Sequence, residues 1–381
     1  MTFRTTLLAS AATLALAGAA MAEQTALVLF ETKGMTTEPR REGMAVLDID
    51  PASPDFGEVL VEYPLPTGTV GHHIFYNPDR TRAYVTSLGS PVLHVFDMTA
   101  QPYRRTEIAV PDCVVGEDVA FSPATGRWFL TCMGSSKVIV GDLATDEVEE
   151  VWDLPEPWPH GITVREDLGR ILVTSTANPA VMGEYGDSVT ELDLQTGEVV
   201  AVHSTRAAGA EAPSGPVEIF FVPHAEPPVA YVTNIPQGDL WIAEWDPGAE
   251  AFAFRQGFDF TALGQGMALE VYFDEENARA YVTTAAPGHV NAFDISDPRN
   301  PRHLGAVGTA PGAHHMTFSA DGALAFVQNG LMNIDGLNDG SITVVDLAAM
   351  ESVGSIDTFK EAGFTVNMIE GMPDDPRAHT H

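Results

Sequence analysis

The hydrophobic and polar positions of the chain follow one order that recurs along most of its length. Each unit starts with an apolar strand, turns through residues rich in Pro, Asp or Gly, and returns as a second strand of β-branched and aromatic residues. Copies of this unit begin at Gly71, Gly116, Pro159, Pro216, Ala268 and Ala313. The pattern predicts six β-hairpins of one repeating structure.

A third apolar strand that ends in aspartate follows every hairpin, and one earlier copy precedes the first hairpin. The seven aspartates are Asp48, Asp97, Asp142, Asp193, Asp246, Asp294 and Asp346. They lie 49, 45, 51, 53, 48 and 52 residues apart, the length expected of a four-stranded propeller blade with variable loops. We therefore predict an all-β protein, a seven-bladed β-propeller.

The first blade is short of its innermost strand, because the chain before residue 58 supplies only two strands. Residues 364–371 (FTVNMIEG) have the innermost-strand pattern, and we expect them to pair with the amino-terminal strands and close the ring. Closure removes the exposed sheet edges that would invite aggregation. The propeller is predicted to span residues 23–371, and residues 372–381 to form a disordered tail.

Three of the second strands carry a common motif. It reads AYVTS from Ala83, AYVTN from Ala230 and AYVTT from Ala280. The motif resembles that of the YVTN-type β-propellers, and the resemblance extends over essentially the whole chain after residue 22. It implies the propeller fold but no single function, since propellers of this kind include metal enzymes, lactonases, cofactor-binding proteins and scaffolds.

Residues 1–22 have the three parts of a secretory signal. Arg4 is followed by an apolar run from Thr6 to Ala20 and by the small-residue cleavage pattern Ala20-Met21-Ala22. The run is shorter than the roughly 20 residues that cross a bilayer, and no later stretch is both that long and uncharged. We therefore expect a periplasmic or secreted protein that does not insert into the membrane, the alternative being an uncleaved anchor.

The chain is strongly acidic, with 19 basic against 53 acidic residues and a net charge of −34. This charge repels phosphate backbones and anionic lipid, so nucleic acid and membrane surfaces are poor partners. Cys113 and Cys132 lie in one repeat unit, and an oxidising compartment permits a disulfide between them. Buried free thiols, or a soft metal ligand at Cys132, are the alternatives.

Ionisable residues recur where the innermost strands begin. Alignment of the six internal repeats places these pairs at the same two positions: His72-His73, Glu117-Asp118, His160-Gly161, Val217-Glu218, Leu269-Glu270 and His314-His315. Each ionisable group that is withdrawn from water costs several kcal/mol unless it is paired or binds a metal. Because the innermost strands surround the propeller axis, we expect five histidines and four carboxylates to converge in the central channel.

Imidazole and carboxylate together suit a transition metal. We expect one metal ion, with copper or zinc favoured and iron or manganese possible, held by His72 or His73, by His160, and by His314 or His315. Adjacent residues of a strand point to opposite sides, so only one histidine of each pair is expected to ligate. Glu218 and Glu270 are candidates to complete the ligand set or to act as general base.

The loops that follow the second strands should join the same face of the ring. This places His289, in the segment APGHV, near the rim of the site as a further candidate ligand. The two longer loops, which start at Ala177 and Gly330, are candidates for a lid over the channel mouth. The remaining histidines are assigned to the surface, to packing or to the tail: His94, His203, His224, His303, His379 and His381.

The inner-strand histidines also resemble those of the copper-site propeller of nitrous oxide reductases, and of related copper enzymes acting on small sulfur compounds. The histidines that match this arrangement are His72-His73, His160 and His314-His315 only. Carboxylates occupy the positions where a copper cluster would need more imidazoles. We also expect no separate electron-transfer domain after the propeller. The departures favour one metal ion over a multinuclear cluster.

Several functions remain open at this point. The chain is interpreted first as a metal-dependent enzyme, an oxidoreductase or hydrolase with a small-molecule substrate, and second as a metal carrier that meets a metal-delivery partner. A lactonase-like enzyme, a nonmetal active site, a protein-binding scaffold and a polar channel in which His and Glu simply pair are the alternatives. The sequence has no phosphate-binding glycine loop, Gly-x-Ser-x-Gly elbow, Cys-x-x-Cys-His haem motif or His-Glu-x-x-His motif.

Overall fold

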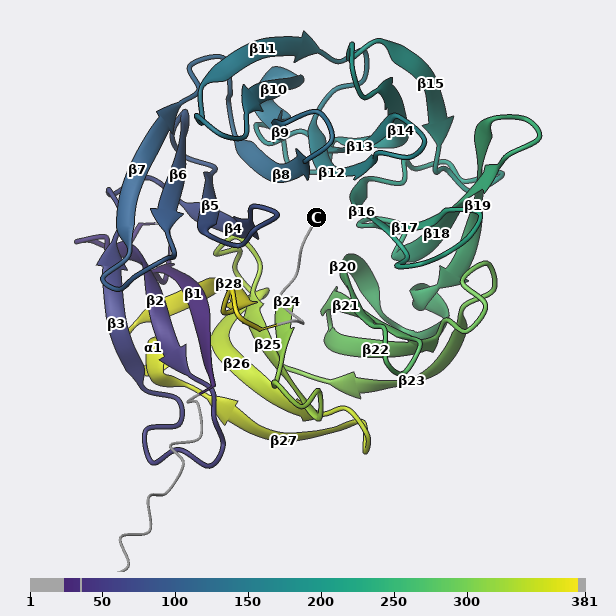
Figure 1. The fold of residues 1–381 in the computed structure, drawn as a ribbon. Coiled ribbons are helices and arrows are strands. Elements are labelled where there is room, and N and C mark those ends of the chain that lie inside the picture. The colour runs from purple at the N-terminus through teal and green to yellow at the C-terminus, as the bar shows by residue number, and fades with distance from the viewer. Residues whose placement is uncertain (1–23, 35, 376–381) are drawn as a thin grey trace, which may run out of the picture.

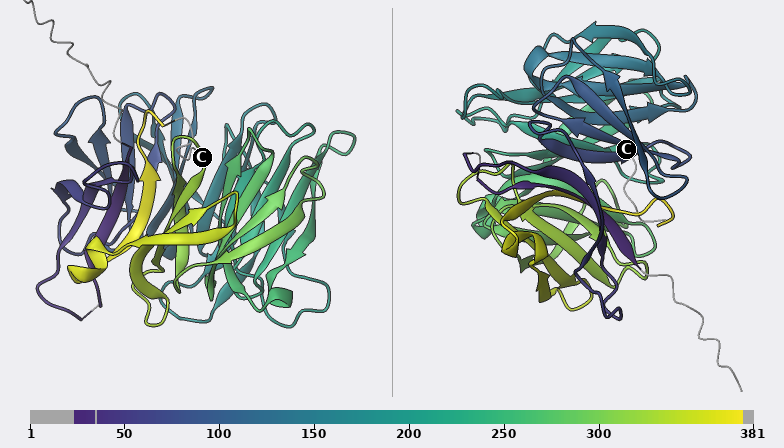
Figure 2. Two further views of the ribbon diagram at one scale, coloured as in Figure 1. Left: turned by 90° about the horizontal axis from the view of Figure 1, so that it is seen from below. Right: turned by 90° about the vertical axis from the view of Figure 1, so that its left-hand side faces the viewer.

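Seven four-stranded antiparallel sheets stand around a central axis in the computed structural model, which describes residues 24–34 and 36–375 (Figure 1). Seen from the side, the sheets stand next to one another as the blades of a disc (Figure 2). The predicted seven-bladed β-propeller is therefore confirmed. Among the described residues, no helix is long and apolar enough to cross a membrane.

The innermost strand of each blade faces the axis and the second strand lies behind it. The innermost strands, in order around the ring, are β28 (Phe364–Gly371), β4 (Gly71–Tyr76), β8 (Gly116–Ser122), β12 (Pro159–Arg165), β16 (Pro216–Phe221), β20 (Gly266–Asp274) and β24 (Ala313–Phe318). The second strands are β1 (Thr25–Thr32), β5 (Arg82–Ser87), β9 (Arg127–Cys132), β13 (Arg170–Ala177), β17 (Val229–Asn234), β21 (Arg279–Ala286) and β25 (Leu324–Gly330).

The third and fourth strands complete each blade toward the rim. The third strands are β2 (Glu42–Asp48), β6 (Val92–Asp97), β10 (Lys137–Asp142), β14 (Tyr185–Asp193), β18 (Asp239–Asp246), β22 (Gly288–Asp294) and β26 (Asn338–Asp346). The fourth strands are β3 (Val59–Pro64), β7 (Arg104–Ala109), β11 (Val148–Asp153), β15 (Val199–Ser204), β19 (Ala251–Asp259), β23 (Arg302–Gly308) and β27 (Glu351–Ile356). Helical structure is confined to α1 (Thr358–Glu361) and two 3-10 turns, Met133–Ser135 and Phe260–Leu263, in the described part of the chain.

Burial decreases from the axis to the rim. Every residue of β4, β8 and β24 is buried, whereas most residues of β7 and β27 are exposed. The apolar core lies between neighbouring blades, where one cluster joins side chains of β16–β18 to side chains of β20–β22. Because blades pack face to face, their inner strands lose water on both sides and read as nearly continuous apolar runs.

The seven aspartates that end the third strands have a common structural role. Asp142 accepts hydrogen bonds at Oδ1 from the backbone N–H groups of Ala144 and Thr145, at 3.0 and 2.7 Å. The same turn recurs at Asp48, Asp97, Asp193, Asp246, Asp294 and Asp346. A short carboxylate bonded to the backbone two residues ahead starts the turn into the fourth strand, which explains why aspartate marks the repeat.

The ring closes as the sequence predicts. Strand β28 pairs antiparallel with β1, with Val28 opposite Ile369, and becomes the innermost strand of the first blade. The hydroxyl of Tyr76, in the neighbouring blade, donates a 2.8 Å hydrogen bond to the carbonyl of Gly371 at the end of β28. The two ends of the described chain therefore complete one blade between them.

The two terminal segments that the sequence singles out lie largely outside this description. The whole predicted signal segment, residues 1–22, is outside the described residues, as are residues 376–381 of the predicted tail. Residues 372–375 are described, and the Arg80 guanidinium donates hydrogen bonds to the carbonyls of Pro373 and Asp375. This first part of the tail is thus held against the β4–β5 hairpin.

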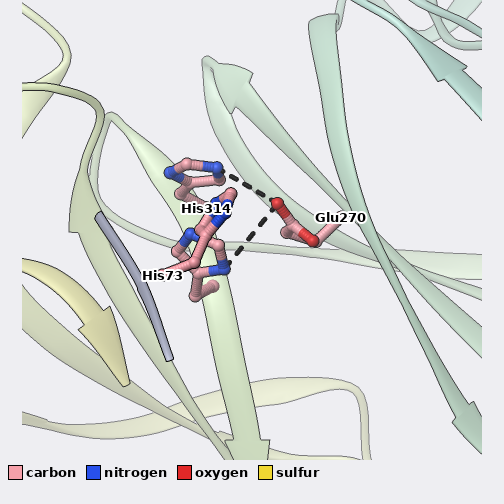
Figure 3. A group of neighbouring side chains, drawn as sticks. His73, Glu270 and His314 are labelled. Carbon is pink, nitrogen blue, oxygen red and sulfur yellow. Dashed lines mark ion pairs between the residues drawn. The ribbon is translucent and has the colours of Figure 1, made fainter. Parts of the chain in front are cut away.

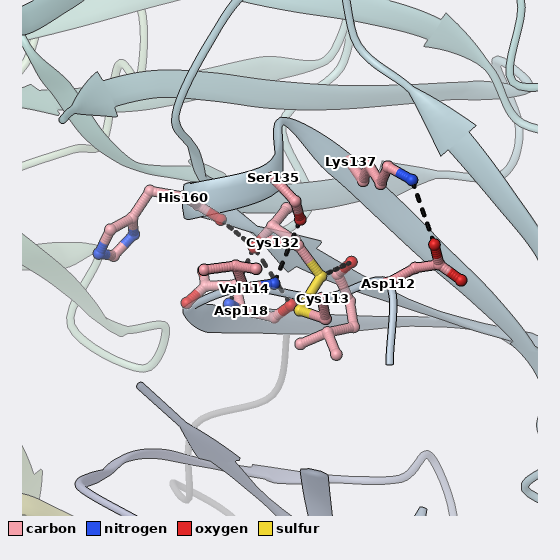
Figure 4. The surroundings of a disulfide bond; sticks show 10 residues. Asp112, Cys113, Val114, Asp118, Cys132, Ser135, Lys137 and His160 are labelled. Atoms are coloured by element: carbon pink, nitrogen blue, oxygen red, sulfur yellow. Dashed lines mark hydrogen bonds and ion pairs between the residues drawn. A yellow bond between two sulfur atoms is a disulfide. The ribbon is translucent and has the colours of Figure 1, made fainter. Parts of the chain in front are cut away.

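A disulfide joins Cys113, just before β8, to Cys132 at the end of β9 (Figure 4). Cys132 is also the backbone partner of Gly116, the first residue of β8. The bond agrees with the disulfide expected for an oxidising compartment, and it replaces the alternatives of free thiols and a thiolate metal ligand. It ties down the loop that leads into the Glu117-Asp118 pair.

Candidate metal centre

A β-bulge near the start of the innermost strand aims the ionisable side chains in six blades. At each bulge two residues of the inner strand lie opposite one residue of the second strand. The opposed sets are His72-His73 with Thr86, Glu117-Asp118 with Thr131, His160-Gly161 with Thr174, Val217-Glu218 with Thr233, Leu269-Glu270 with Thr283, and His314-His315 with Gln328. Every ionisable residue found by the alignment is therefore a bulged residue.

Hydroxyl groups of the opposing threonines fix these bulges. The backbone N–H groups of His73 and Asp118 donate to the hydroxyls of Thr86 and Thr131, at 3.1 and 3.0 Å. Glu218 and Glu270 make the same bond to their own threonines. Each hydroxyl of Thr131, Thr174 and Thr233 also donates to a bulge carbonyl of the next blade. Three of the threonines, Thr86, Thr233 and Thr283, are those of the AYVT motif, so the motif connects the fold to the geometry of the channel.

The bulges bring both members of each histidine pair into the channel. The imidazole rings of His72 and His73 stack with centroids 4.1 Å apart, and those of His314 and His315 lie 3.9 Å apart. The expectation that one histidine of each pair points away is wrong, because a bulge interrupts the alternation of side chains along a regular strand. All five channel histidines are 6% exposed or less.

The first donor set consists of His72, Glu117 and His160. Glu117 Oε2 lies 3.5 Å from His72 Nε2 and 3.6 Å from His160 Nε2, distances too long for good hydrogen bonds. Two ligands of one tetrahedral ion with bonds of 2.0–2.1 Å lie about 3.3 Å apart. On its other side His160 Nδ1 lies 2.9 Å from Glu218 Oε1, a contact that leaves Nε2 to face the set.

The second donor set consists of His73, Glu270, His314 and His315. Glu270 Oε1 lies 3.2 Å from His314 Nε2 and 3.7 Å from His315 Nδ1, and Figure 3 shows the carboxylate across from His314. His314 Nδ1 is buried without a hydrogen-bond partner among the described residues. The donor atoms of this set, like those of the first, lie within 4.8 Å of one another.

A third donor set of His73, Asp118 and Glu218 lies beside the other two. His73 Nδ1 is 2.7 Å from Asp118 Oδ1. Gly161 leaves the space that the Glu218 carboxylate occupies, because a Cβ at residue 161 would meet Glu218 Oε2 at 2.9 Å and the carbonyl of Val217 at 2.6 Å. The missing side chain of the fourth blade is therefore part of how the site is formed.

Burial sets the protonation of the cluster. It lowers the pKa of His160 to about 4 and that of His314 to about 3, while the carboxylate of Asp118 acts in the opposite direction on both. Burial also raises the pKa of Glu117, Glu218 and Glu270 well above the usual range, and the nearby carboxylate of Asp118 adds to the rise. His160 and His314 are therefore neutral near pH 7, the form that binds metal ions.

The space inside the cluster is small. A cavity of about 10 Å³, enough for the centre of one water-sized sphere, is lined by His73, Phe75, Asp118, Glu218, Glu270, His315 and Met368. Buried imidazole and carboxylate donors around a space of this size fit a transition-metal ion. The donors do not select one metal among copper, zinc, iron and manganese.

An apolar cover closes one end of the site. The loop between β25 and β26 contributes three side chains to an apolar cluster, Leu331, Ile334 and Leu337. The cluster also contains Val217 and Leu269, the bulge residues that precede Glu218 and Glu270. This is one of the two predicted lid loops. In the other, between β13 and β14, Val181 and Met182 are 45% and 89% exposed, and this loop extends into solvent.

Seven of the eight residues selected from the sequence meet in the channel: His72, His73, His160, Glu218, Glu270, His314 and His315. The eighth, His289, lies in none of the donor sets. It is half-buried on β22 opposite Thr284, and its Nδ1 is 3.1 Å from the carbonyl of Pro287. His289 therefore lies on the third strand of its blade, with two strands between it and the axis. The expected position near the rim of the site is wrong.

Asp118, Glu117 and Tyr272 belong to the site but were not selected as site residues from the sequence. The alignment of the repeats already places Glu117 and Asp118 at the two positions that hold histidines in other blades, and this alignment could have identified them as site residues. The Tyr272 hydroxyl accepts the N–H of Met316 at 3.0 Å and lies 3.5 Å from His315 Nδ1. Tyr272 follows Glu270 by two residues in β20, so strand alternation places it on the same face.

Comparisons with known proteins support the fold. No protein-family model and no curated protein matches the sequence. A hypothetical selenium-binding protein from Sulfolobus tokodaii is similar in structure, with a TM-score of 0.76, 12% identity and coverage of 95% of this chain and 96% of that one. A protein from Lactobacillus plantarum gives a TM-score of 0.62 at 13% identity over 92% of this chain and 99% of its own.

Hydrazine synthase from Kuenenia stuttgartiensis is a further similar structure, with a TM-score of 0.54 and 15% identity over 74% of this chain and 78% of that one. At these identities the similarity is evidence for the β-propeller fold alone. Membership of the YVTN-type family is supported only as far as this fold.

Proposed function

We propose that the chain is an exported metalloprotein whose central channel holds a transition-metal ion and acts on a small substrate. The observation that carries the proposal is the spacing of the first donor set. Glu117 Oε2 stands 3.5 and 3.6 Å from two imidazole nitrogens, close to the separation of ligands around one ion and longer than a good hydrogen bond.

A polar channel without metal accounts less well for these residues. Such a channel would pair its buried donors and acceptors by hydrogen bonds, because an unpaired buried polar group costs about 1–3 kcal/mol. His314 Nδ1 has no such partner among the described residues, and Glu117 is held at ligand spacing from His72 and His160. A cation bound between Glu117, His72 and His160 would satisfy the donor atoms of that set together.

The residues of the channel divide into ligands and a proton carrier. The ion would be held either by His72, His160 and Glu117 or by His73, His314, His315 and Glu270. When bound, the metal would supply Lewis acidity or electron transfer. Glu218, whose pKa burial raises, can carry a proton near pH 7 and transfer it to or from a substrate.

The enclosure of the site favours an enzyme over a carrier. Its histidines are 6% exposed or less, and the loop 331–337 packs over one end of the channel. A carrier needs accessible ligands, whereas an enzyme benefits from excluding water around the reacting atoms. The size of the cavity limits the reacting part of a substrate to a few atoms unless the loop moves.

Export rests on the signal pattern of residues 1–22, and the Cys113–Cys132 disulfide supports an oxidising compartment. We expect the mature chain to begin at Glu23. Intact-mass measurement of the protein secreted by its source cells checks this, and a chain that retains residues 1–22 would contradict it.

Metal content tests the proposal. The mature chain is purified from medium that contains several metals, dialysed mildly, and analysed by elemental mass spectrometry. We expect at least one equivalent in the wild type, a lower metal content in H160A or H315A, and an unchanged content in H94A, a buried histidine of β6 outside the donor sets. Less than about 0.1 equivalent in the wild type would overturn the proposal.

A further inference from the structure

The first and second donor sets share no residue. The first uses His72, Glu117 and His160, and the second uses His73, Glu270, His314 and His315. In each set the donor atoms lie within 4.8 Å of one another, so each can reach one ion after small movements. A single ion does not need seven protein ligands, because transition metals in proteins bind about four to six.

We propose that the channel holds two divalent transition-metal ions, one in each donor set. The two ions would lie side by side in one buried site. This inference rests on the proposed function and extends it from one ion to a dinuclear centre, the arrangement in which a substrate is held between two metals about 3.5–4 Å apart.

The charge of the cluster agrees with two ions. Glu117, Asp118, Glu218 and Glu270 are each 2% exposed or less, and no lysine or arginine forms an ion pair with them among the described residues. Ionised, they carry four negative charges, which two divalent ions neutralise. A single divalent ion would leave two charges to be neutralised by retained protons, since unpaired buried charge is strongly unfavourable.

Asp118 lies beside the second set and next to a residue of the first. Its Oδ1 lies 2.7 Å from Nδ1 of His73, a member of the second set. It also follows Glu117, a member of the first set, in the same bulge. Asp118 therefore adds a buried carboxylate to the surroundings of the two sets.

Carboxylates that belong to neither the first nor the second set lie against two of the imidazoles. His160 Nδ1 lies 2.9 Å from Glu218, and His73 Nδ1 lies 2.7 Å from Asp118. A carboxylate beside one nitrogen of a metal-binding imidazole orients the ring toward the metal. The two contacts occur one in each set, as expected if each set has its own ion.

Stoichiometry and selective loss test this proposal. The mature chain is stripped with a chelator, reloaded with Zn²⁺, desalted and analysed for bound zinc. We expect two equivalents in the wild type and one in each of four single variants: H160Q and E117Q, which impair the first set, and H314Q and H315Q, which impair the second. The H160Q/H314Q double variant should bind none, and H94Q should bind two.

Each other outcome has a definite meaning. One equivalent in the wild type, lost completely in variants of either set, would overturn the dinuclear centre while leaving the proposed function intact. No bound zinc in the wild type, together with no other bound metal, would overturn both. Circular dichroism of every stripped variant confirms folding, so that a loss of zinc is assigned to the ligand.

Paramagnetic resonance of the Cu²⁺-loaded protein gives a second, independent measurement. Two Cu²⁺ ions a few ångströms apart interact magnetically and give a half-field signal, whereas H160Q and H314Q should each give the signal of an isolated ion. Two equivalents of Cu²⁺ without any interaction in the wild type would place the second ion elsewhere and overturn the proposal.

Discussion

At the scale of the residue, one hydroxyl group in each of four blades fixes the bulge that aims an ionisable side chain into the channel. Thr86, Thr131, Thr233 and Thr283 accept the N–H of the second bulged residue, and that residue, His73, Asp118, Glu218 or Glu270, belongs to a donor set. Glycine at position 161 contributes by leaving space for Glu218. The chemistry of the channel therefore depends on residues that are not themselves ligands.

Gly161→Ala should weaken metal binding. The new Cβ would meet the backbone of Val217 and the carboxylate of Glu218, so Glu218 must leave His160 Nδ1. Losing a carboxylate contact behind a metal-binding histidine typically costs about 10- to 100-fold in affinity. A zinc competition titration measures the change. Gly305→Ala, on β23 with open space around its Cβ, is the matched control, and equal affinities in the two variants would contradict this role of Gly161.

The affinity for zinc should rise with pH. Burial raises the pKa of Glu117, Glu218 and Glu270, so metal must displace protons that these carboxyls hold in the metal-free protein. His160 and His314, with pKa values of about 4 and 3, are already neutral above pH 5 and compete little. Between about pH 5 and 8 we expect at least a tenfold gain in affinity and measurable proton release by calorimetry in two buffers. An affinity independent of pH would show that the carboxyls take no part.

At the scale of the element, the fold was open to prediction and the direction of the side chains was not. The third-strand aspartates recur because each starts a turn, so their spacing predicts the number of blades. The apolar pattern of residues 364–371 predicts the strand that closes the ring. Side chains alternate along a regular strand, so the sequence predicted that the two histidines of each pair point to opposite sides of the strand and that only one of them ligates. The bulge depends on pairing with a threonine in another strand, which no local pattern expresses. His289 was misplaced because its loop proved to be the start of a third strand.

The disulfide stabilises the element that carries Glu117 and Asp118. Cys113 and Cys132 are 19 residues apart, a loop for which chain entropy predicts a contribution of about 3 kcal/mol. In a chain of this size that corresponds to a fall of roughly 4 °C in the melting temperature of the C113S/C132S variant. Calorimetry with and without a reductant checks it. When the wild type is reduced, its melting temperature should fall to that of the variant. A variant with the same melting temperature as the oxidised wild type would contradict the prediction.

At the scale of the whole molecule, closure of the ring brings the last strand of the described chain to the site. Strand β28 completes the first blade, Tyr76 donates a hydrogen bond to its last residue, and Met368 lines the small cavity of the channel. The same closure covers the edge of β1, which would otherwise be free to pair with another molecule. The ring and the site therefore form together.

Removal of residues 364–381 should leave the first blade with three strands and an exposed edge. We expect the shortened chain to aggregate, because an unpaired apolar strand is a template for pairing. Removal of residues 376–381 alone is the control and should leave a monomer that melts as the full chain does. Size-exclusion chromatography compares the two, and a monomeric, metal-binding product of the longer deletion would show that closure is dispensable.

Anomalous diffraction at the zinc absorption edge, from crystals of the zinc-loaded mature chain, tests the central claim most directly. Zinc is predicted on the propeller axis, with one anomalous peak within bonding distance of His72, Glu117 and His160, and a second within bonding distance of His314 and Glu270. A single peak in the channel would preserve the metal site and reduce it to one ion. An empty channel, with zinc only at surface residues or absent, would contradict the account.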